Sequence, residues 1–221
     1  MIGQLRPNYV HILNRYNETL KQRNNYLKQI KEDGKSEELL EIWDEKLAEY
    51  GEKIYTYRAE FVEKIKLKIG EIHNKITNEK ENIKLEYISN CENKEKYLDL
   101  LKERRKLDII KGYTTKGIHR DDFNIYINDK LVGIYGSQGQ NRTTVLSLKI
   151  SELQVIYDEV GEYPILLLDD FMSELDEKRR TSFIENIKNT QVIITCTDKI
   201  DMKDTDYKMF NVKNGEVIEK Q

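Results

Sequence analysis

The chain has 221 residues, of which 38% are hydrophobic and 35% charged, and its net charge is −3 at pH 7. This balance argues against one compact globule and indicates that part of the chain forms long, solvated helices. It also excludes a general basic field, so any DNA contact has to come from a local patch. Two distant cysteines, no secretory signal and no bilayer-length apolar run predict a reduced, cytoplasmic protein with no membrane partner.

Residues 1–80 carry two apolar stripes with helical spacing. The first ends at Asp33-Gly34, and the second runs from Leu39 to Ile76. The short connection between them predicts an antiparallel helical hairpin, which we expect to form a helical arm. Tyrosines and Arg23 at seam positions favour an arm that packs loosely on itself, or against a missing neighbour, over a tight leucine zipper.

Residues 81–221 are expected to form an α/β lobe. Alternating apolar residues predict a strand at 83–87, and a helix follows from Lys94 to about Lys111. One face of that helix carries Lys102, Arg104, Arg105 and Lys106. A solvated helix face is favoured there, and a DNA contact is the weaker alternative.

A polar segment, Gly117–Asp122, precedes the next expected strand. His119 has no Ser or Cys nucleophile nearby and no HxxxH spacing, so it is interpreted neither as a catalytic nor as a zinc-binding residue. We expect Arg120 to form a local structural cluster with Asp121 and Asp122. Alternation at 123–127 then predicts a strand that turns at 128–130.

A glycine-rich, hydroxyl-bearing loop, Gly136–Thr143, opens a mostly apolar helix. Free backbone N–H groups and the positive helix end make such a loop an anion site, and Ser137 can add a hydroxyl donor. The alternative is a flexible loop with an ordinary helix N-cap.

The run Ile165–Leu168 predicts a strand buried on both faces, as in the middle of a parallel sheet. Asp169 and Asp170 follow it, at the edge where open α/β folds bind ligands, and carboxylates there suit Mg²⁺. An acidic turn before the next helix is the alternative. Beyond Ser173-Glu174, Asp176 is expected to cap that helix.

The end of the chain predicts further strands. Residues 192–194 are expected to form a second buried strand, which leads into Thr195-Cys196-Thr197-Asp198. Asn214-Gly215 predicts a terminal β-hairpin, because Asn-Gly suits the tight turns that join antiparallel strands.

Taken together, GIHRDD, GSQGQNRT, LLLDDFMSELD and QVIITCTD resemble the RecF family of DNA replication and repair proteins. The resemblance covers essentially the whole chain, including QRNNYLK in the arm. It implies an α/β fold, namely the C-terminal lobe of an ABC-type (P-loop NTPase) ATPase head with a helical-hairpin arm. No GxxxxGK[ST] occurs, so the chain resembles the C-terminal portion of a RecF protein without its Walker A lobe.

The resemblance also implies roles for individual residues. Ser137, Gly139 and Gln140 would belong to the signature that reaches the γ-phosphate bound on the opposite subunit. Asp169 would hold Mg²⁺ through water, and Asp170 would be the catalytic residue that orients or deprotonates the attacking water. Asp176 would be the D-loop aspartate, and Thr197 lies near the switch position.

At the level of the whole protein, the resemblance implies ATP and Mg²⁺ as cofactors once the missing lobe is present. It implies an ATP-dependent homodimer that binds DNA at single-strand gaps and acts with RecO and RecR to load RecA, in association with the nucleoid. The chain alone is expected not to hydrolyse ATP, and to expose an apolar face where the other lobe docks. Two alternatives are a coiled-coil tether that needs no nucleotide and a self-standing DNA-binding module.

Overall fold

The computed structural model describes the chain except for residues 78–79, 171–174, 188, 198–205 and 221. Ser173, Glu174 and Asp198 of the sequence motifs therefore lie outside the described residues. The chain divides into two compact units, Met1–Glu162 and Tyr163–Gln221, and each is described by itself. This division falls later than the domain boundary expected after residue 80, which stays a prediction.

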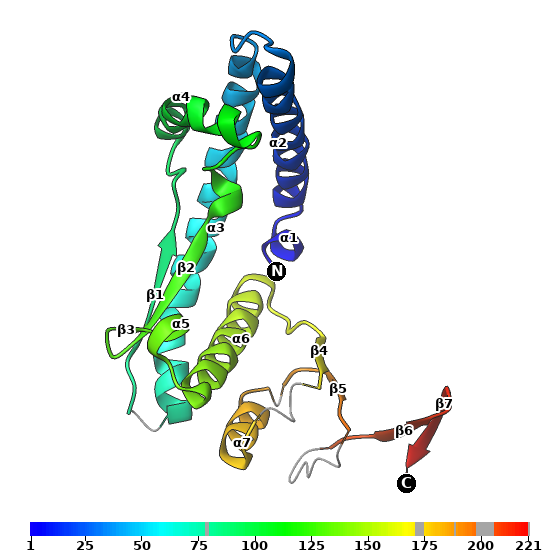
Figure 1. Cartoon of the computed structure of the whole chain (residues 1–221). Coiled ribbons are helices and arrows are strands. Elements are labelled where there is room, and N and C mark those ends of the chain that lie inside the picture. Colours follow the sequence, from blue (N-terminus) through cyan, green and yellow to red (C-terminus); the bar gives the residue numbers. More distant parts are fainter. Residues whose placement is uncertain (78–79, 171–174, 188, 198–205, 221) are drawn as a thin grey trace. The chain divides into compact units, whose positions relative to one another are not determined.

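The first unit begins with the predicted helical hairpin. After a short helix α1 (Ile2–Leu5), α2 (Pro7–Asp33) and α3 (Leu40–Thr77) run side by side in opposite directions (Figure 1). Pro7 occupies the first turn of α2, where its missing N–H is not needed. Gly34 ends α2 with φ +66°, and its N–H donates to the carbonyl oxygen of Ile30. The hairpin prediction is thus confirmed.

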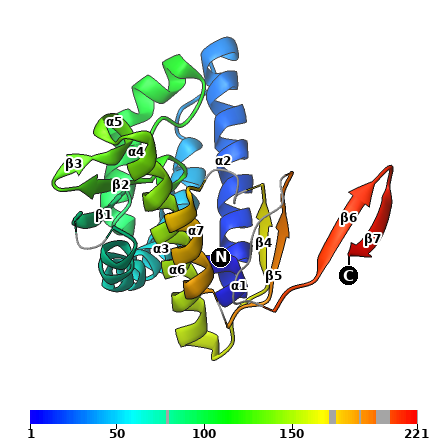
Figure 2. The ribbon, with the colours of Figure 1, turned by 90° about the horizontal axis from the view of Figure 1, so that it is seen from below.

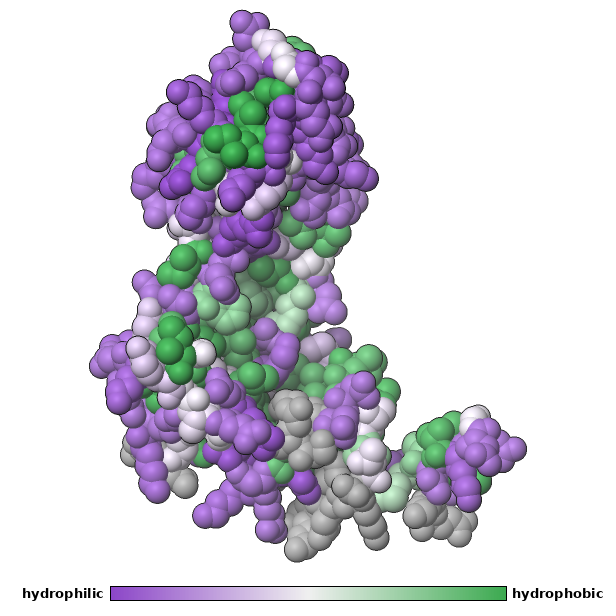
Figure 3. Space-filling view, viewed as in Figure 1, coloured by the Kyte–Doolittle hydropathy of each residue, from purple (hydrophilic) through white to green (hydrophobic). Residues whose placement is uncertain are grey.

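The arm packs tightly, because a third helix, α4 (Lys94–Lys111), contacts both α2 and α3. Leu27, Leu40 and Leu47 are fully buried, so the expectation of loose packing is wrong. On the face that Figure 3 shows, hydrophilic residues cover most of the arm and surround a hydrophobic patch.

Arg23 is fully buried at the junction of these three helices. Its Nε lies 2.7 Å from Asp44 Oδ1 on α3, and its Nη1 lies 2.8 Å from Asp108 Oδ2 on α4. Arg105 adds a second cation, 2.9 Å from Asp44 Oδ2. Two arginines therefore balance two buried carboxylates, which is why a charged residue can occupy the seam.

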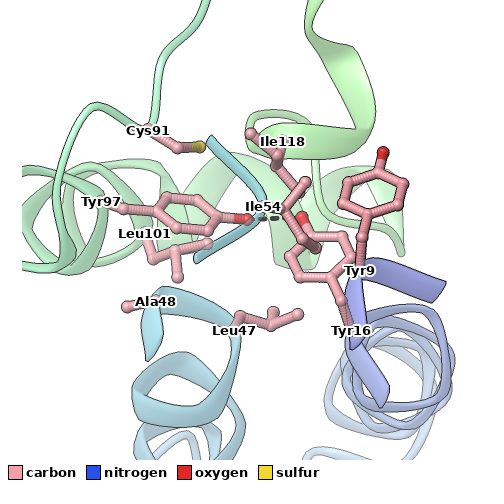
Figure 4. Packing of buried hydrophobic residues seen from close by; sticks show 9 residues of the cluster. All are labelled: Tyr9, Tyr16, Leu47, Ala48, Ile54, Cys91, Tyr97, Leu101 and Ile118. Atoms are coloured by element: carbon pink, nitrogen blue, oxygen red, sulfur yellow. Dashed lines mark hydrogen bonds between the residues drawn. The ribbon is translucent and has the colours of Figure 1, made fainter. Parts of the chain in front are cut away.

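A second junction joins the arm to the GIHRDD segment. The Tyr16 hydroxyl lies 2.8 Å from the Tyr97 hydroxyl and 2.8 Å from His119 Nδ1, within a buried cluster of aromatic and aliphatic side chains (Figure 4). Gly117 precedes the short 3₁₀ helix η1 (Ile118–Arg120) with φ +143°, and a Cβ there would lie 2.0 Å from the Tyr97 hydroxyl oxygen. Only glycine therefore fits at the first position of this segment, where the segment packs against the arm.

The charged residues of this segment pair differently from the prediction. Asp121 lies 3.7 Å from Arg58 Nη1 and accepts a hydrogen bond from Tyr87, whereas Arg120 lies over the Tyr113 ring, 5.9 Å from its centre. No ion pair joins Arg120 to Asp121 or Asp122 in the described part of the chain, so that expected cluster is wrong. Arg58 reaches Asp121 from α3, and local sequence does not reveal it.

A three-stranded antiparallel sheet packs along α3. Its order is β1 (Ile83–Ile88), β2 (Asp122–Ile127) and β3 (Lys130–Leu131). The strands predicted at 83–87 and 123–127 are confirmed, whereas the sequence did not predict their pairing or β3. Asn128 and Asp129 turn β2 into β3 with φ +49° and +62°, the conformation of a tight hairpin. After α5 (Val132–Tyr135), α6 (Gln138–Val160) packs against α3 (Figure 1), and the buried core between these elements includes Ile69, Leu85 and Val155.

The second unit holds a parallel pair and a hairpin, which are seen separately in Figure 2. β4 (Leu166–Asp169) pairs in parallel with β5 (Val192–Thr195), and α7 (Glu177–Asn186) lies between them in sequence. β6 (Met209–Lys213) and β7 (Glu216–Lys220) form the predicted terminal hairpin through Asn214-Gly215.

The predicted burial of β4 and β5 on both faces is wrong. Ile165 is 61% exposed, Leu167 71% and Ile193 55%, while Leu166 and Leu168 are half-buried. In the described part of the chain this sheet has β4 and β5 alone, so alternate side chains point into solvent. Figure 3 shows the resulting apolar surface on this unit. We call Ile165, Leu167 and Ile193 the open sheet face.

No helix within the described ranges is long and apolar enough to cross a membrane.

Candidate nucleotide-binding site

The glycine-rich loop closes into an ordered helix cap. The Ser137 Oγ accepts a hydrogen bond from the Gln140 backbone N–H at 3.2 Å, and the Gln140 Oε1 accepts from the Ser137 N–H at 2.9 Å. This reciprocal pair is a capping box at the N-terminus of α6. The hydroxyl acts only as an acceptor in the cap, so its hydrogen can still be donated to a ligand.

Gly139 lies in the first turn of α6, and its carbonyl oxygen accepts a hydrogen bond from the Thr143 hydroxyl at 2.9 Å. Ser137 is exposed, so the positive end of a 23-residue helix opens to solvent beside a hydroxyl donor. This geometry suits an anion such as a phosphate. An ordinary capped helix has the same geometry. The anion site therefore stays a prediction.

The carboxylates of the second unit lie at the carboxyl end of the parallel pair. Asp169 is in register with Thr195 on β5, and its Oδ1 accepts a hydrogen bond from the Thr195 hydroxyl at 2.5 Å. The Asp170 N–H donates to the Thr195 carbonyl oxygen at 3.2 Å and lies 3.1 Å from the Thr195 Oγ. Thr195 thus fixes both aspartates, a role that sequence reasoning missed although the residue ends a predicted neighbouring strand.

Asp170 adopts φ +48°, a left-handed conformation that aspartate and asparagine tolerate better than most residues. Asp169 and Asp170 are both exposed. No group of three or more His, Cys, Asp or Glu side chains comes together among the residues that the structure describes. Two carboxylates without a closed cage fit Mg²⁺, which retains waters and takes further ligands from phosphates.

The D-loop candidate has a clear local role. Asp176 caps α7 by accepting a hydrogen bond from the Arg179 N–H at 2.9 Å, and it pairs with the Arg179 side chain. The backbone hydrogen bond and the nearby guanidinium hold the pKa of Asp176 below its usual value. Thr197 is exposed in a bend after β5. Their proposed nucleotide roles stay predictions.

The basic run of α4 does not form one open face. Arg105 is only 17% exposed and is paired with Asp44, and Arg104 is half-buried. Lys102 and Lys106 are exposed. The structure therefore assigns Arg105 to the arm junction and leaves the two lysines as the accessible charges of the predicted DNA contact.

Comparison with known proteins relates the whole chain to one family, although no family model matches it. The chain is 44% identical, over 98% of its length, to the DNA replication and repair protein RecF of Clostridium perfringens, and 42% identical to that of an Exiguobacterium species. The chain belongs to the RecF family. It spans 61% of the length of the first of these RecF proteins and 62% of the second.

A solved structure confirms the fold of this RecF chain. It is described as the recombination mediator protein RecF with ATP in the RecFOR pathway, and it is 38% identical with a TM-score of 0.86. The match covers 100% of this chain and 60% of that one. A second structure, of RecF with ATPrS, has a TM-score of 0.84. The predicted α/β fold, the C-terminal lobe of an ABC-type ATPase head with a helical-hairpin arm, is therefore confirmed.

Proposed function

We propose that this RecF chain supplies the signature and Mg²⁺-binding half of a composite ATP site, in a protein that binds DNA in an ATP-dependent manner. The observation that carries the proposal is the edge of β4 and β5. There Asp169 and Asp170 follow one another at the edge where parallel sheets bind ligands. Thr195 donates to the Asp169 carboxylate and contacts the Asp170 backbone N–H. The names of the RecF relatives, and of RecF structures with ATP, support it.

Each residue then has a defined task. Mg²⁺ supplies charge neutralisation and alignment of the phosphates, and Asp169 would hold it through water. Asp170 would accept a hydrogen bond from the attacking water and orient it. Ser137, Gly139 and Gln140 would meet the γ-phosphate held by the opposite subunit, with Ser137 donating its hydroxyl hydrogen. Asp176 and Thr197 would flank the same site as D-loop and switch residues.

With the two halves on different subunits, dimerisation depends on bound ATP, since the nucleotide held by one subunit meets the signature loop of the other. The dimer would then act at single-strand gaps in DNA, with RecO and RecR, in loading RecA. The tether and the self-standing DNA-binding module are less favoured, because neither needs carboxylates at a sheet edge or a capped signature loop.

The test uses this chain alone and a chimaera. In the chimaera, the part of the Clostridium perfringens RecF that this chain does not match is placed before it. We expect no ATP turnover above background by the chain alone. The chimaera should hydrolyse Mg²⁺-ATP, dimerise with ATP and bind gapped DNA, and Asp169→Asn should abolish its turnover. Turnover by the chain alone that Asp169→Asn removes, or a folded chimaera that binds no ATP, would contradict the proposal.

A further inference from the structure

A chain of hydrogen bonds runs from the signature loop to the end of the arm helix α3. Gln140 Nε2 donates to Glu81 Oε1 at 3.0 Å, while Gln140 Oε1 accepts from the Ser137 N–H. The other Glu81 oxygen, Oε2, lies 3.1 Å from His73 Nε2 on α3. His73 Nδ1 lies 2.9 Å from the Ser147 Oγ on α6. All of these residues belong to the first unit.

The inner members of this chain are removed from solvent. His73 and Ser147 are fully buried, and the Glu81 side chain is 20% exposed. As the neutral Nε2–H tautomer, His73 donates to Glu81. The Ser147 Oγ lies 2.9 Å from His73 Nδ1 and 2.9 Å from the Thr143 carbonyl oxygen, so its one hydroxyl hydrogen faces two acceptors. Burial lowers the pKa of His73, which favours the neutral ring, and the neighbouring Glu81 opposes that shift. Hydrogen bonds that are linked in such a chain strengthen one another.

We propose that Glu81 is a positioning residue for the signature loop and that His73 fixes Glu81 in turn. Rotating the side-chain amide of Gln140 by half a turn exchanges its oxygen and nitrogen with little change in shape. The nitrogen can only donate a hydrogen bond, and the oxygen can only accept one. With Nε2 on Glu81, Oε1 must face the Ser137 N–H, so Glu81 sets the orientation that closes the capping box. The end of α3 thereby determines where the Ser137 backbone and hydroxyl lie.

This inference rests on the proposed function for its consequence, because a fixed Ser137 matters only if the loop meets nucleotide. Its structural part stands independently. If Glu81 served only to tie the chain after α3 to α6, its loss would reduce stability without a specific effect on the Ser137 N–H. If its charge acted on the nucleotide, neutralisation would be as harmful as truncation.

The first experiment measures amide hydrogen exchange at Ser137 in this chain by NMR. Glu81→Ala should speed exchange there about fivefold, the equivalent of one ordinary hydrogen bond. Glu81→Gln should leave it within about twofold, because the new amide can accept from Gln140 through oxygen and donate to His73 through nitrogen. His73 is then the Nδ1–H tautomer, which accepts at Nε2 and donates to the Ser147 Oγ. Glu71→Ala is the matched control, since Glu71 is an exposed residue of α3 that pairs with Lys75 on its own helix.

The second experiment measures ATP-dependent dimerisation of the chimaera by sedimentation. Glu81→Ala should weaken it at least about fivefold at unchanged ATP affinity of the monomer, with Glu81→Gln and Glu71→Ala near the parent. Unchanged Ser137 exchange in Glu81→Ala would overturn the inference. So would a Glu81→Gln variant as impaired as Glu81→Ala. A parent chimaera that does not dimerise with ATP would instead refute the proposed function, and the exchange data would still decide the role of Glu81.

Discussion

Replacing Arg23 with methionine tests the ion network of the arm most directly. Methionine keeps much of the side chain's length but removes the cation that pairs with Asp108, whose side chain is fully buried. Among the described residues, no other cation forms an ion pair with Asp108. Asp44 retains Arg105, so the damage concentrates on Asp108. Removing one partner of a buried ion pair costs about 3–5 kcal/mol, because the remaining charge is left unpaired away from water. We expect the free energy of unfolding of the first unit to fall by that amount.

The assay is urea unfolding followed by the fluorescence of Trp43. It is the chain's single tryptophan, lies next to Asp44 in sequence and packs near Tyr26, with ring centres 4.9 Å apart. With a slope of about 1–3 kcal/mol per molar urea, the midpoint should fall by at least about 1 M. Arg15→Met, at an exposed position of the same helix, should change the free energy by less than about 0.5 kcal/mol.

A double variant separates unpaired charge from lost packing. Adding Asp108→Asn to Arg23→Met removes the stranded charge, so at least about 1 kcal/mol of the lost stability should return. The reasoning is refuted if Arg23→Met differs from Arg15→Met by less than about 1 kcal/mol. It is equally refuted if Asp108→Asn destabilises the Arg23→Met variant as much as it destabilises the parent.

Further predictions concern Gly117, the candidate nucleotide-binding site and the open sheet face. Gly117→Ala should destabilise the first unit by more than about 1 kcal/mol in the same urea assay, because its Cβ would overlap the Tyr97 hydroxyl. In the chimaera, Asp170→Asn should slow hydrolysis while ATP binding persists, since the amide can hydrogen-bond water but cannot take its proton and tolerates φ +48°; failure to bind ATP would indicate a metal-binding role. Ser137→Arg should abolish ATP-dependent dimerisation without weakening monomer ATP binding, and equal loss of both would refute the composite site. Leu167→Lys should reduce concentration-dependent self-association of this chain in sedimentation, and no self-association by the parent would count against the open sheet face as a docking surface.

Local patterns in the sequence were sufficient to locate the longer helices and most of the strands. The ends of the hairpin helices, the span Lys94–Lys111, and the turns at Asn128 and Asn214 all follow from caps, turn residues and periodicity. These signals act within a few residues of chain, so neighbouring sequence contains the physical cause. The family resemblance likewise depended on short motifs whose order along the chain is visible without a structure.

Only the tertiary structure decided which side chains meet. Arg23 contacts Asp108, 85 residues away, and Gln140 contacts Glu81, 59 residues away. Periodicity marks Arg23 as a seam residue but carries no information about its partner. The aliphatic run alone did not reveal the exposure of Leu167, because four such residues in a row indicate a buried strand whatever strands are present to cover it. The expectation of an exposed apolar face came from the family resemblance. The burial of a side chain depends on which elements pack around it, whereas helix caps and turns depend on residues that are neighbours in the sequence.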